Sequence, residues 1–547
     1  MSAPHSTRPA PCAVLPRSAA PVAPRFGAPR AWLYGVALWL CAAGASASAS
    51  PVWTDALGDP SAQARQAVQL LQNADAEGLN PSDYQADTLA HALQQGAPVD
   101  MWAPQLTAAL QHYLRDLRQG RVPPQQVQEH YRQPDTTELV LEQALASEHL
   151  QDLVRRTTPA MPQYRELRDA LAHYRQLAQH PAWQQPLPPL PGRRLSPGAA
   201  WAGLPLLQQR LQALGDLPAS VDPNAPAPTQ YDATLRAGVE AFQSRHGLTP
   251  DGVIGAETLA ALNVTPAQRA EQIALGMERL RWLPEPRGPR MVVVNLPEFV
   301  LRAYSLDQGR PQQALRMKVI VGKALKTSTP LFDEDMRFIE FSPYWNIPPS
   351  IARGETIPRL RRDPGYFQRQ GLELVDRQGK VVPGFDATHL DAVLRGQMRI
   401  RQRPGPHNAL GDIKFVFPNH NNIYLHHTPS TQLFERTRRD FSHGCIRIED
   451  PHALAQFVLQ DEPEWTPERI RSAMERGKSS TLRLKTPVPV VLAYHTTVVQ
   501  HGQVHFLPDI YRRDPQLAQA LQRHSQTQHA STRLSSAQAL RPGATSE

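Results

Sequence analysis

The hydrophobic pattern of the chain changes near residue 290, and this change constrains the fold more than any other feature. Before it, apolar residues recur at helical spacing, as in the run from Leu106 through Leu110 to Leu117. From Met291 onward, short β-branched runs bounded by Pro, Gly and Asn predict strands instead. We therefore expect a multidomain protein with all-α parts first and a mostly β domain after them.

A proline-rich cluster divides the helical part. Proline accounts for 54 of 547 residues, and its densest run, PLPPLPGRRLSP from Pro186, predicts an extended linker. The expected units are a helical scaffold domain at 53–185, the linker at 186–203, a module of three short helices at 204–263, a β domain at 290–510 and a polar, disordered tail at 525–547. Late in the β domain we expect helices at 451–459 and 467–476 and a pair of strands at 488–494 and 504–507.

The first 47 residues read as an export signal. Four arginines and no acid precede an apolar run from Ala31 to Ala43. This run of roughly 13 residues is shorter than the roughly 20 that span a bilayer. Small residues at 45–49 then offer cleavage sites, so we expect a secretory signal peptide at 1–47, with an uncleaved anchor as the alternative. The remaining chain is mildly basic, which suits a polyanionic cell wall and ordinary solubility equally well.

Export makes one thiol conspicuous. Of three cysteines, Cys12 and Cys41 lie in the predicted signal, which leaves Cys445 without a partner for an internal disulfide. It stands in Ser442-His443-Gly444-Cys445-Ile446-Arg447. A thiol with a pKa of about 8.5 is mostly protonated at neutral pH, so it needs a basic neighbour to act as a nucleophile. His426 and His443 are the candidates.

The residues around Cys445 suggest distinct roles. His426 ends an apolar run, and the backbone carbonyl of His427 is placed to accept its Nδ1 proton and fix the tautomer. Gly444 permits a tight turn that directs amides at a developing oxyanion. Arg447 is a candidate for holding a substrate carboxylate. Together these residues predict nucleophilic catalysis by a cysteine.

At these positions the sequence resembles the L,D-transpeptidases of peptidoglycan, whose pattern is a His, about fifteen residues and then Ser-any-Gly-Cys-any-Arg. Residues 427–441 separate His426 from Ser442, as that pattern requires. The stretches WNIPPSI from Trp345 and PGPHNALG from Pro404 resemble blocks of the large, multidomain Gram-negative branch. Residues 204–263 resemble the small three-helix peptidoglycan-binding domain. His427 departs from the Asp often found there, with little loss expected because the family uses the backbone carbonyl.

The resemblance implies an L,D-transpeptidase-type β-sandwich with a lid insertion at 352–403, and a periplasmic cysteine acyltransferase. Cys445 would attack a stem peptide, release D-Ala and form a thioester, with His426 as general base and acid. The acyl group would pass to a second stem as a 3→3 cross-link, or to a lipoprotein lysine, a D-amino acid or water. Susceptibility to carbapenems is implied as well. The residues expected to bind substrate are Ser442, His443, Arg447, Trp345 and Asn346.

Partners and rival readings follow from the same residues. We expect peptidoglycan stem peptides and wall-synthesis enzymes as partners, no nucleic acid, no cofactor and no metal, with membrane anchorage only if the signal is retained. A zinc site made of His426, His427, His443 and Cys445 lacks the usual ligand spacing. An inactive wall-binding scaffold is disfavoured by the complete Cys, His, Gly and Arg set.

Overall fold

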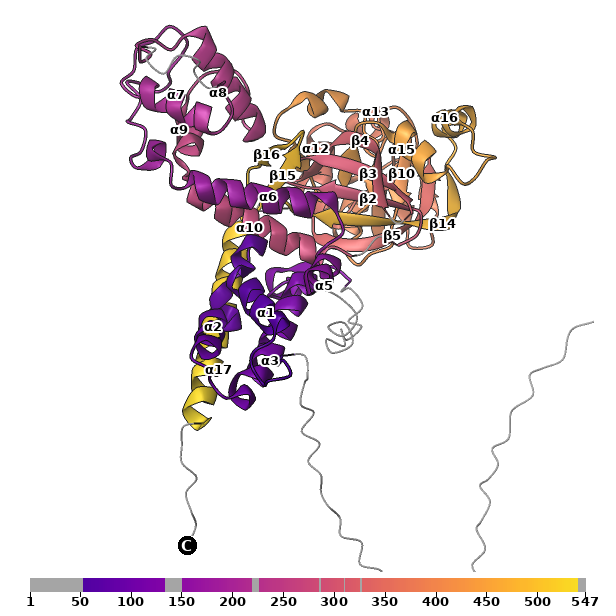
Figure 1. Ribbon diagram of the computed structural model, residues 1–547. Helices are drawn as coiled ribbons and strands as arrows, with labels where there is room; N and C mark the ends of the chain where they lie inside the picture. Colours follow the sequence, from indigo (N-terminus) through magenta and orange to yellow (C-terminus); the bar gives the residue numbers. More distant parts are fainter. Residues whose placement is uncertain are drawn as a thin grey trace, which may run out of the picture. The chain divides into compact units, whose positions relative to one another are not determined.

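A computed structural model describes residues 53–132, 150–218, 226–284, 287–308, 310–324 and 327–539, with side chains described as far as residue 530 (Figure 1). The predicted signal peptide at 1–47 lies outside the described residues. Helices come first and strands dominate after residue 290, so the predicted change of architecture is confirmed.

The first helices form a core of their own. They are α1 (Ala62–Gln72), α2 (Ala86–Gln94), α3 (Val99–Gln119) and α5 (Leu150–Thr157), with 3₁₀ turns η1 (Ala74–Glu77) and η2 (Pro81–Tyr84). Two further 3₁₀ turns, η3 (Pro124–Val127) and η4 (Pro181–Trp183), lie outside this core. The predicted face of α3, from Leu106 to Leu117, is buried in this core beside Trp53 and Trp102. Helix α6 (Pro162–Leu177) instead packs against α10 (Pro266–Trp282) in a separate cluster.

The three predicted short helices are present as α7 (Leu204–Ala213), α8 (Ala233–Arg245) and α9 (Ala256–Asn263). The proline-rich segment before them forms no helix and no strand of a sheet, and it is not a free tether. Leu187 and Leu195 are buried in the module's core. The buried guanidinium of Arg210 donates to the carbonyls of Ala182 and Gln185 at 2.9 and 2.6 Å. The linker is therefore wrapped onto the module that follows it.

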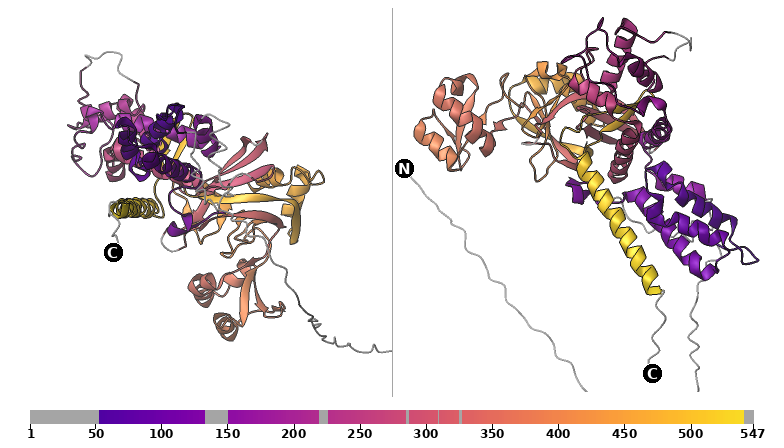
Figure 2. Two further views of the ribbon diagram at one scale, coloured as in Figure 1. Left: turned by 60° about the horizontal axis from the view of Figure 1, so that its bottom comes forward. Right: turned by 90° about the vertical axis from the view of Figure 1, so that its left-hand side faces the viewer.

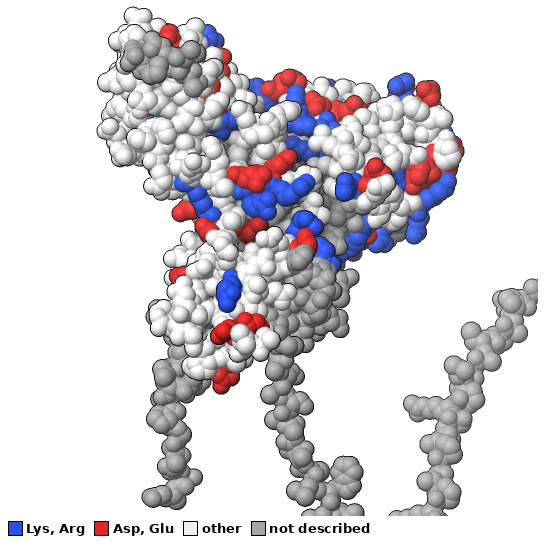
Figure 3. Space-filling view, in the orientation of Figure 1, with Lys and Arg blue, Asp and Glu red and all other residues white. Residues whose placement is uncertain are grey.

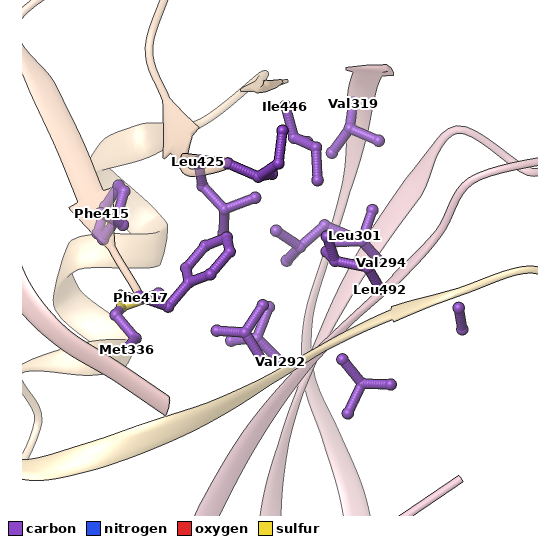
Figure 4. Packing of buried hydrophobic residues seen from close by; sticks show 14 of the residues in the cluster. Val292, Val294, Leu301, Val319, Met336, Phe415, Phe417, Leu425, Ile446 and Leu492 are labelled. Atoms are coloured by element: carbon purple, nitrogen blue, oxygen red, sulfur yellow. The ribbon is translucent and has the colours of Figure 1, made fainter. Parts of the chain in front are cut away.

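The β domain is built on a ten-stranded sheet in the order β1-β5-β10-β11-β13-β4-β3-β2-β14, in which β12 pairs with β4 and a further β5–β14 pairing closes the path. Side chains such as Val292, Leu301 and Phe417 point into a common interior (Figure 4). The strands are β1 (Glu129–His130), β2 (Arg290–Asn295), β3 (Val300–Asp307), β4 (Arg310–Gly322), β5 (Leu331–Phe341), β10 (Ile413–Val416), β11 (Leu425–His426), β12 (Asp440–Ser442), β13 (Ile446–Ile448) and β14 (Ser480–Ala493).

An insertion with its own core separates β5 from β10. Its four-stranded sheet has the order β6-β9-β7-β8 and starts at Trp345, earlier than the expected boundary at 352. Leu360, Leu374 and Ile400 are buried in its centre. The elements are β6 (Trp345–Asn346), α11 (Pro349–Ile351), the π-helical turn η5 (Ala352–Thr356), α12 (Ile357–Arg362), α13 (Tyr366–Arg369), β7 (Leu372–Asp376), β8 (Val381–Val382), α14 (Ala387–Leu394) and β9 (Met398–Gln402).

The end of the β domain corrects one predicted pairing. Helices α15 (Pro451–Val458) and α16 (Pro467–Glu475) occupy the expected ranges, but the strands at 488–494 and 504–507 do not pair with each other. Strand β14 pairs with β2 and β5, whereas β16 (Gln503–Phe506) forms a hairpin with β15 (Thr497–Gln500). His501 and Gly502, with φ of 50° and 76°, make the two-residue turn that favours this local hairpin.

The predicted disordered tail at 525–547 is wrong over most of its length, because helix α17 runs from Asp514 to Ala539. Leu517 and Ala520 are buried near its start, and the Ser525 hydroxyl donates to Asp83 Oδ2 at 3.0 Å. Figures 1 and 2 show α17 beside the N-terminal helices. A polar composition rich in Gln and Ala still favours helix when a partner surface holds it.

Segments from both ends of the chain join the β domain. Glu129 and His130 pair in parallel with Leu331 and Phe332 of β5. The buried Arg279 of α10 contacts Glu129 Oε1 at 3.4 Å and Asp514 Oδ1 at 2.5 Å. One guanidinium therefore links the β1 segment, α10 and the first turn of α17.

Arg279→Ala is expected to destabilise the protein by about 3 kcal/mol or more, because Glu129 and Asp514 would lose their buried counter-charge. Urea denaturation followed by tryptophan fluorescence measures the change. The control is Arg155→Ala, which removes an exposed ion pair to Asp152 and should cost less than about 0.5 kcal/mol. Equal losses for the two variants would contradict the assigned role of Arg279.

Charge on the surface is mixed. On the face drawn in Figure 3, acidic and basic side chains alternate, and no single basic patch dominates. Within the described ranges, no helix combines the length and apolar character needed to cross a membrane.

Candidate active site

Parallel pairing of β11 and β13 puts the two predicted reactive residues on neighbouring segments of the sheet. Leu425 is in register with Ile446, and His426 with Arg447. The Ile446 amide donates to the Tyr424 carbonyl at 3.1 Å, which places Cys445 at the start of β13 beside β11. The chain between them, residues 427–441, leaves the sheet and returns through β12.

His426 is held in one tautomer. It is only 4% exposed, and its Nδ1–H donates to the backbone oxygen of His427 at 2.5 Å, the contact expected from the sequence. Burial, reinforced by the charge of Arg447, lowers the pKa of His426 to about 3. The imidazole is therefore neutral at physiological pH, and Nε2 carries a lone pair that can accept a proton.

The side chain of His427 is itself held in place by Asp412 and Gly411. Its Nδ1 lies 2.8 Å from Asp412 Oδ1. Gly411 has φ of 64°, and a Cβ there would lie 2.7 Å from the His427 ring. His427 thus has a side-chain anchor as well as the carbonyl that orients His426.

Cys445 is a half-buried thiol in a polar setting. Its Sγ donates to the Asn422 carbonyl at 3.7 Å. Burial raises the pKa of Cys445, and the Tyr424 hydroxyl, Lys414 and Arg447 oppose that effect without cancelling it. The resting pair is therefore a neutral thiol beside a neutral imidazole, not a thiolate–imidazolium ion pair.

This resting state predicts the pH dependence of thiol alkylation. Because the pKa of Cys445 is raised and that of His426 is lowered, the thiolate fraction should rise continuously above pH 7, with its inflection above about 8.5. The rate of iodoacetamide labelling, followed by intact mass, measures this fraction. A plateau between pH 4 and 8 would instead reveal an ion pair and contradict the expectation.

A glycine turn presents Cys445. Gly444 has φ of 116°, a conformation that side chains disfavour. The Ser442 hydroxyl donates to the Cys445 carbonyl at 2.6 Å and accepts from the Gly444 amide at 3.1 Å, and Thr329 donates to the Gly444 carbonyl at 2.7 Å. Because Ser442 occupies the Gly444 amide, that amide is not available to an oxyanion; Ser442 braces the turn.

The insertion contacts the site at two points. His443 is exposed, and its Nε2 lies 2.7 Å from Glu355 Oε1 in η5. The side chain of Trp345 in β6 lies close to the Tyr424 hydroxyl, whereas the neighbouring Asn346 is exposed. These contacts connect the insertion to the residue just before β11 and to the turn between β12 and β13.

Arg447 is half-buried beside Cys445 and His426. Its Nε is buried, and within the described part of the chain this atom has no hydrogen-bond partner. Burial lowers the pKa of Arg447, and the nearby thiol acts in the opposite direction. The guanidinium therefore remains a cation next to the reacting atoms.

Two residues of the site, Tyr424 and Lys414, were not predicted from the sequence. Tyr424 lies two positions before His426, so strand alternation alone puts both on one side of β11; their ring centroids are 5.7 Å apart. Lys414 is the register partner of His426 on β10, with Nζ 4.4 Å from the Tyr424 ring centroid and 3.1 Å from Glu340 Oε2. Only the pairing of β10 with β11 reveals Lys414.

The zinc alternative is not supported by the ring contacts. His426, His427 and His443 direct a ring nitrogen to three different oxygens, those of His427, Asp412 and Glu355. Within the described ranges, the potential metal ligands that cluster do not include these histidines or Cys445.

Comparison with known proteins agrees with this geometry. Residues 289–490 match the L,D-transpeptidase catalytic domain family, residues 45–171 match a scaffold domain, and residues 203–262 match the family described as "Putative peptidoglycan binding domain". A protein of Haemophilus influenzae named "Putative L,D-transpeptidase" is 31% identical over 247 residues. That alignment covers 45% of this chain and 49% of the relative, so the chain matches about half the relative's length.

One solved structure, a fused Zn-dependent amidase/peptidase/peptidoglycan-binding domain-containing protein from Clostridium acetobutylicum, is 12% identical. The match covers 48% of this chain and 93% of that chain, with a TM-score of 0.16. The peptidoglycan-related domains indicate a protein associated with the cell wall. Residues 289–490 thus match the L,D-transpeptidase catalytic domain, in a multidomain chain that also matches a scaffold domain and a peptidoglycan-binding domain.

Proposed function

We propose that this protein is a periplasmic L,D-transpeptidase that forms 3→3 cross-links between peptidoglycan stem peptides through a thioester on Cys445. The observation that carries the proposal is the pairing of β11 with β13, which puts the buried His426, whose Nδ1 bonds to the His427 carbonyl, on the strand next to the one that Cys445 precedes. The catalytic and peptidoglycan-binding domains support a peptidoglycan substrate.

In the first half-reaction the thiol proton passes to His426 Nε2 as Sγ attacks the carbonyl of the third stem residue. The resulting oxyanion needs amide donors, and because Ser442 occupies the Gly444 amide, the Cys445 amide is the remaining candidate in the turn. Collapse breaks the bond to the terminal D-Ala, whose amine takes the proton from His426. The products are a Cys445 thioester and free D-Ala.

In the second half-reaction the side-chain amine of another stem's diaminopimelate attacks the thioester. His426 accepts a proton from that amine and returns it to the departing sulfur, which restores the neutral thiol and imidazole. The new amide is the cross-link. The carbonyl of His427 stabilises the imidazolium that forms in each half, because it accepts the Nδ1 proton throughout.

Positive charge and the insertion select the donor stem. Arg447 offers a cation beside Cys445 for an anionic group of the stem. Glu355 and Trp345 tie the insertion to His443 and Tyr424, so the insertion acts as a lid that orders the donor over the thiol. Ser442, His443, Trp345 and Asn346 are the other proposed substrate-side residues.

The muropeptide profile tests this function. Peptidoglycan incubated with the purified protein should gain 3→3-linked dimers, and the Cys445→Ala variant should produce none. His420→Gln, which changes an exposed histidine in the β10–β11 loop, is the matched control and should act as the unaltered protein does.

Other products would redirect the proposal. Monomeric tripeptides alone would identify a carboxypeptidase that uses water, and stems joined to lipoprotein lysine or D-amino acids would identify those acceptors. Saturable binding to sacculi without any Cys445-dependent product would identify a non-catalytic scaffold. Each of these results overturns the assignment of 3→3 cross-linking.

A further inference from the structure

Three potential metal ligands converge where α17 meets α3, away from Cys445. They are His112 and Asp116 of α3 and His524 of α17, and their ligand atoms all lie within 4.8 Å of one another. His112 and Asp116 are one helical turn apart and share a face. His112 Nε2 lies 3.3 Å from Asp116 Oδ2.

These distances suit a tetrahedral ion. Bonds of about 2.1 Å at a tetrahedral centre place ligand atoms about 3.4 Å apart. The His112–Asp116 pair already has this separation, and the ligand atom of His524 lies within 4.8 Å of both. The three side chains therefore lie near the spacing that one ion requires.

The surroundings prepare the ligands for a cation. Asp116 is 3% exposed, and the Tyr84 hydroxyl donates to its Oδ2 at 2.9 Å, the outer hydrogen bond that orients a ligating carboxylate. Within the described residues, the buried Nε2 of His524 has no hydrogen-bond partner.

Helix α17 is fixed at this place by a second acid. Asp83 accepts from the Ser525 hydroxyl at 3.0 Å and lies 3.2 Å from His529 Nε2. Arg121 is 3.6 Å from the same carboxylate. His524 is therefore held against α3 by neighbours that do not belong to the ligand set.

We propose that His112, Asp116 and His524 bind one late first-row divalent metal ion, Zn²⁺ by ligand type, which fastens α17 to the scaffold helix α3. Two imidazoles and one carboxylate disfavour Mg²⁺ and Ca²⁺, which prefer oxygen ligands. Three protein ligands leave a fourth position for water. The sequence predicted no metal because these ligands come from opposite ends of the chain.

Zinc titration of the chelator-stripped protein tests the site. The Cys445→Ala background with the other thiols alkylated removes sulfur ligands. We expect one Zn²⁺ per chain in competition with a chromophoric chelator, and a rise in thermal midpoint on binding. His112→Gln or His524→Gln should weaken affinity by about 100-fold, and Tyr84→Phe by about 10-fold. His91→Gln, an exposed histidine on α2, should change nothing.

Absence of stoichiometric binding, or equal affinity in the His112→Gln and His524→Gln variants, would overturn the site. Circular dichroism without metal shows whether the variants fold. Because loss of folding would mimic loss of a ligand, Co²⁺ substitution in the protein with all three ligands intact provides an independent readout. Tetrahedral visible absorption without a thiolate band supports the site, and its absence refutes it.

Discussion

Replacing Cys445 with alanine is expected to abolish covalent capture of a carbapenem. The unaltered protein should gain the mass of one intact carbapenem per chain, because Sγ of Cys445 opens the β-lactam ring as it would attack a stem peptide. Alanine has no nucleophile, so the loss should be complete. Intact-mass spectrometry after incubation measures the adduct.

This experiment also tests the proposal that Cys445 carries the chemistry. A matched Ser430→Ala variant removes a small polar group from the loop after β11 and should retain the full adduct. An equal adduct on the Cys445→Ala protein, or none on the unaltered protein, would show that another residue reacts or that the site is inert.

Replacing His426 with asparagine is expected to slow acylation by about 10²–10⁴-fold, the usual contribution of a positioned general base. The asparagine amide can still donate to the His427 carbonyl in place of Nδ1, but nothing replaces Nε2. Stopped-flow or timed mass measurement of adduct formation gives the rate. The raised pKa of Cys445 makes the defect large, since little thiolate forms without a base.

A high-pH measurement separates loss of the base from loss of structure. Raising the pH generates thiolate directly, so the gap between the His426→Asn variant and the unaltered protein should narrow above about pH 9. His443→Gln is the comparison, because His443 contacts Glu355 and not the His427 carbonyl, and it should lose far less rate. A pH-independent gap would assign His426 a purely structural role.

The sequence was sufficient to predict the local elements. Helical spacing identified the buried face of α3, and β-branched runs identified β2, β3 and β10, because these patterns reflect which side of an element is buried. The contact between His426 and the His427 carbonyl was also predictable, since both lie on consecutive residues.

Features that depend on distant pairing were not predictable. Residues 504–507 could pair either with the nearby 497–500 or with the strand at 488–494, and only the fold shows that the local pairing is formed. Lys414 lies at the site because it is the register partner of His426. Helix α17 is stabilised by its contacts with Asp83 and the N-terminal helices. For Lys414 and α17 the deciding residues lie far along the chain, where periodicity carries no information.

The participation of β1 and α17 in the β domain bears on modularity. Tyr131 donates to the Leu492 carbonyl at 2.9 Å, and Arg513 donates to the Val127 carbonyl at 3.0 Å, so both flanks close over the core. The segment that matches the family, residues 289–490, ends inside this shared interior. Residues 289–490 therefore do not contain the whole β domain. A fragment or a recombined protein that keeps this core intact would also have to include the segments around Tyr131 and Arg513.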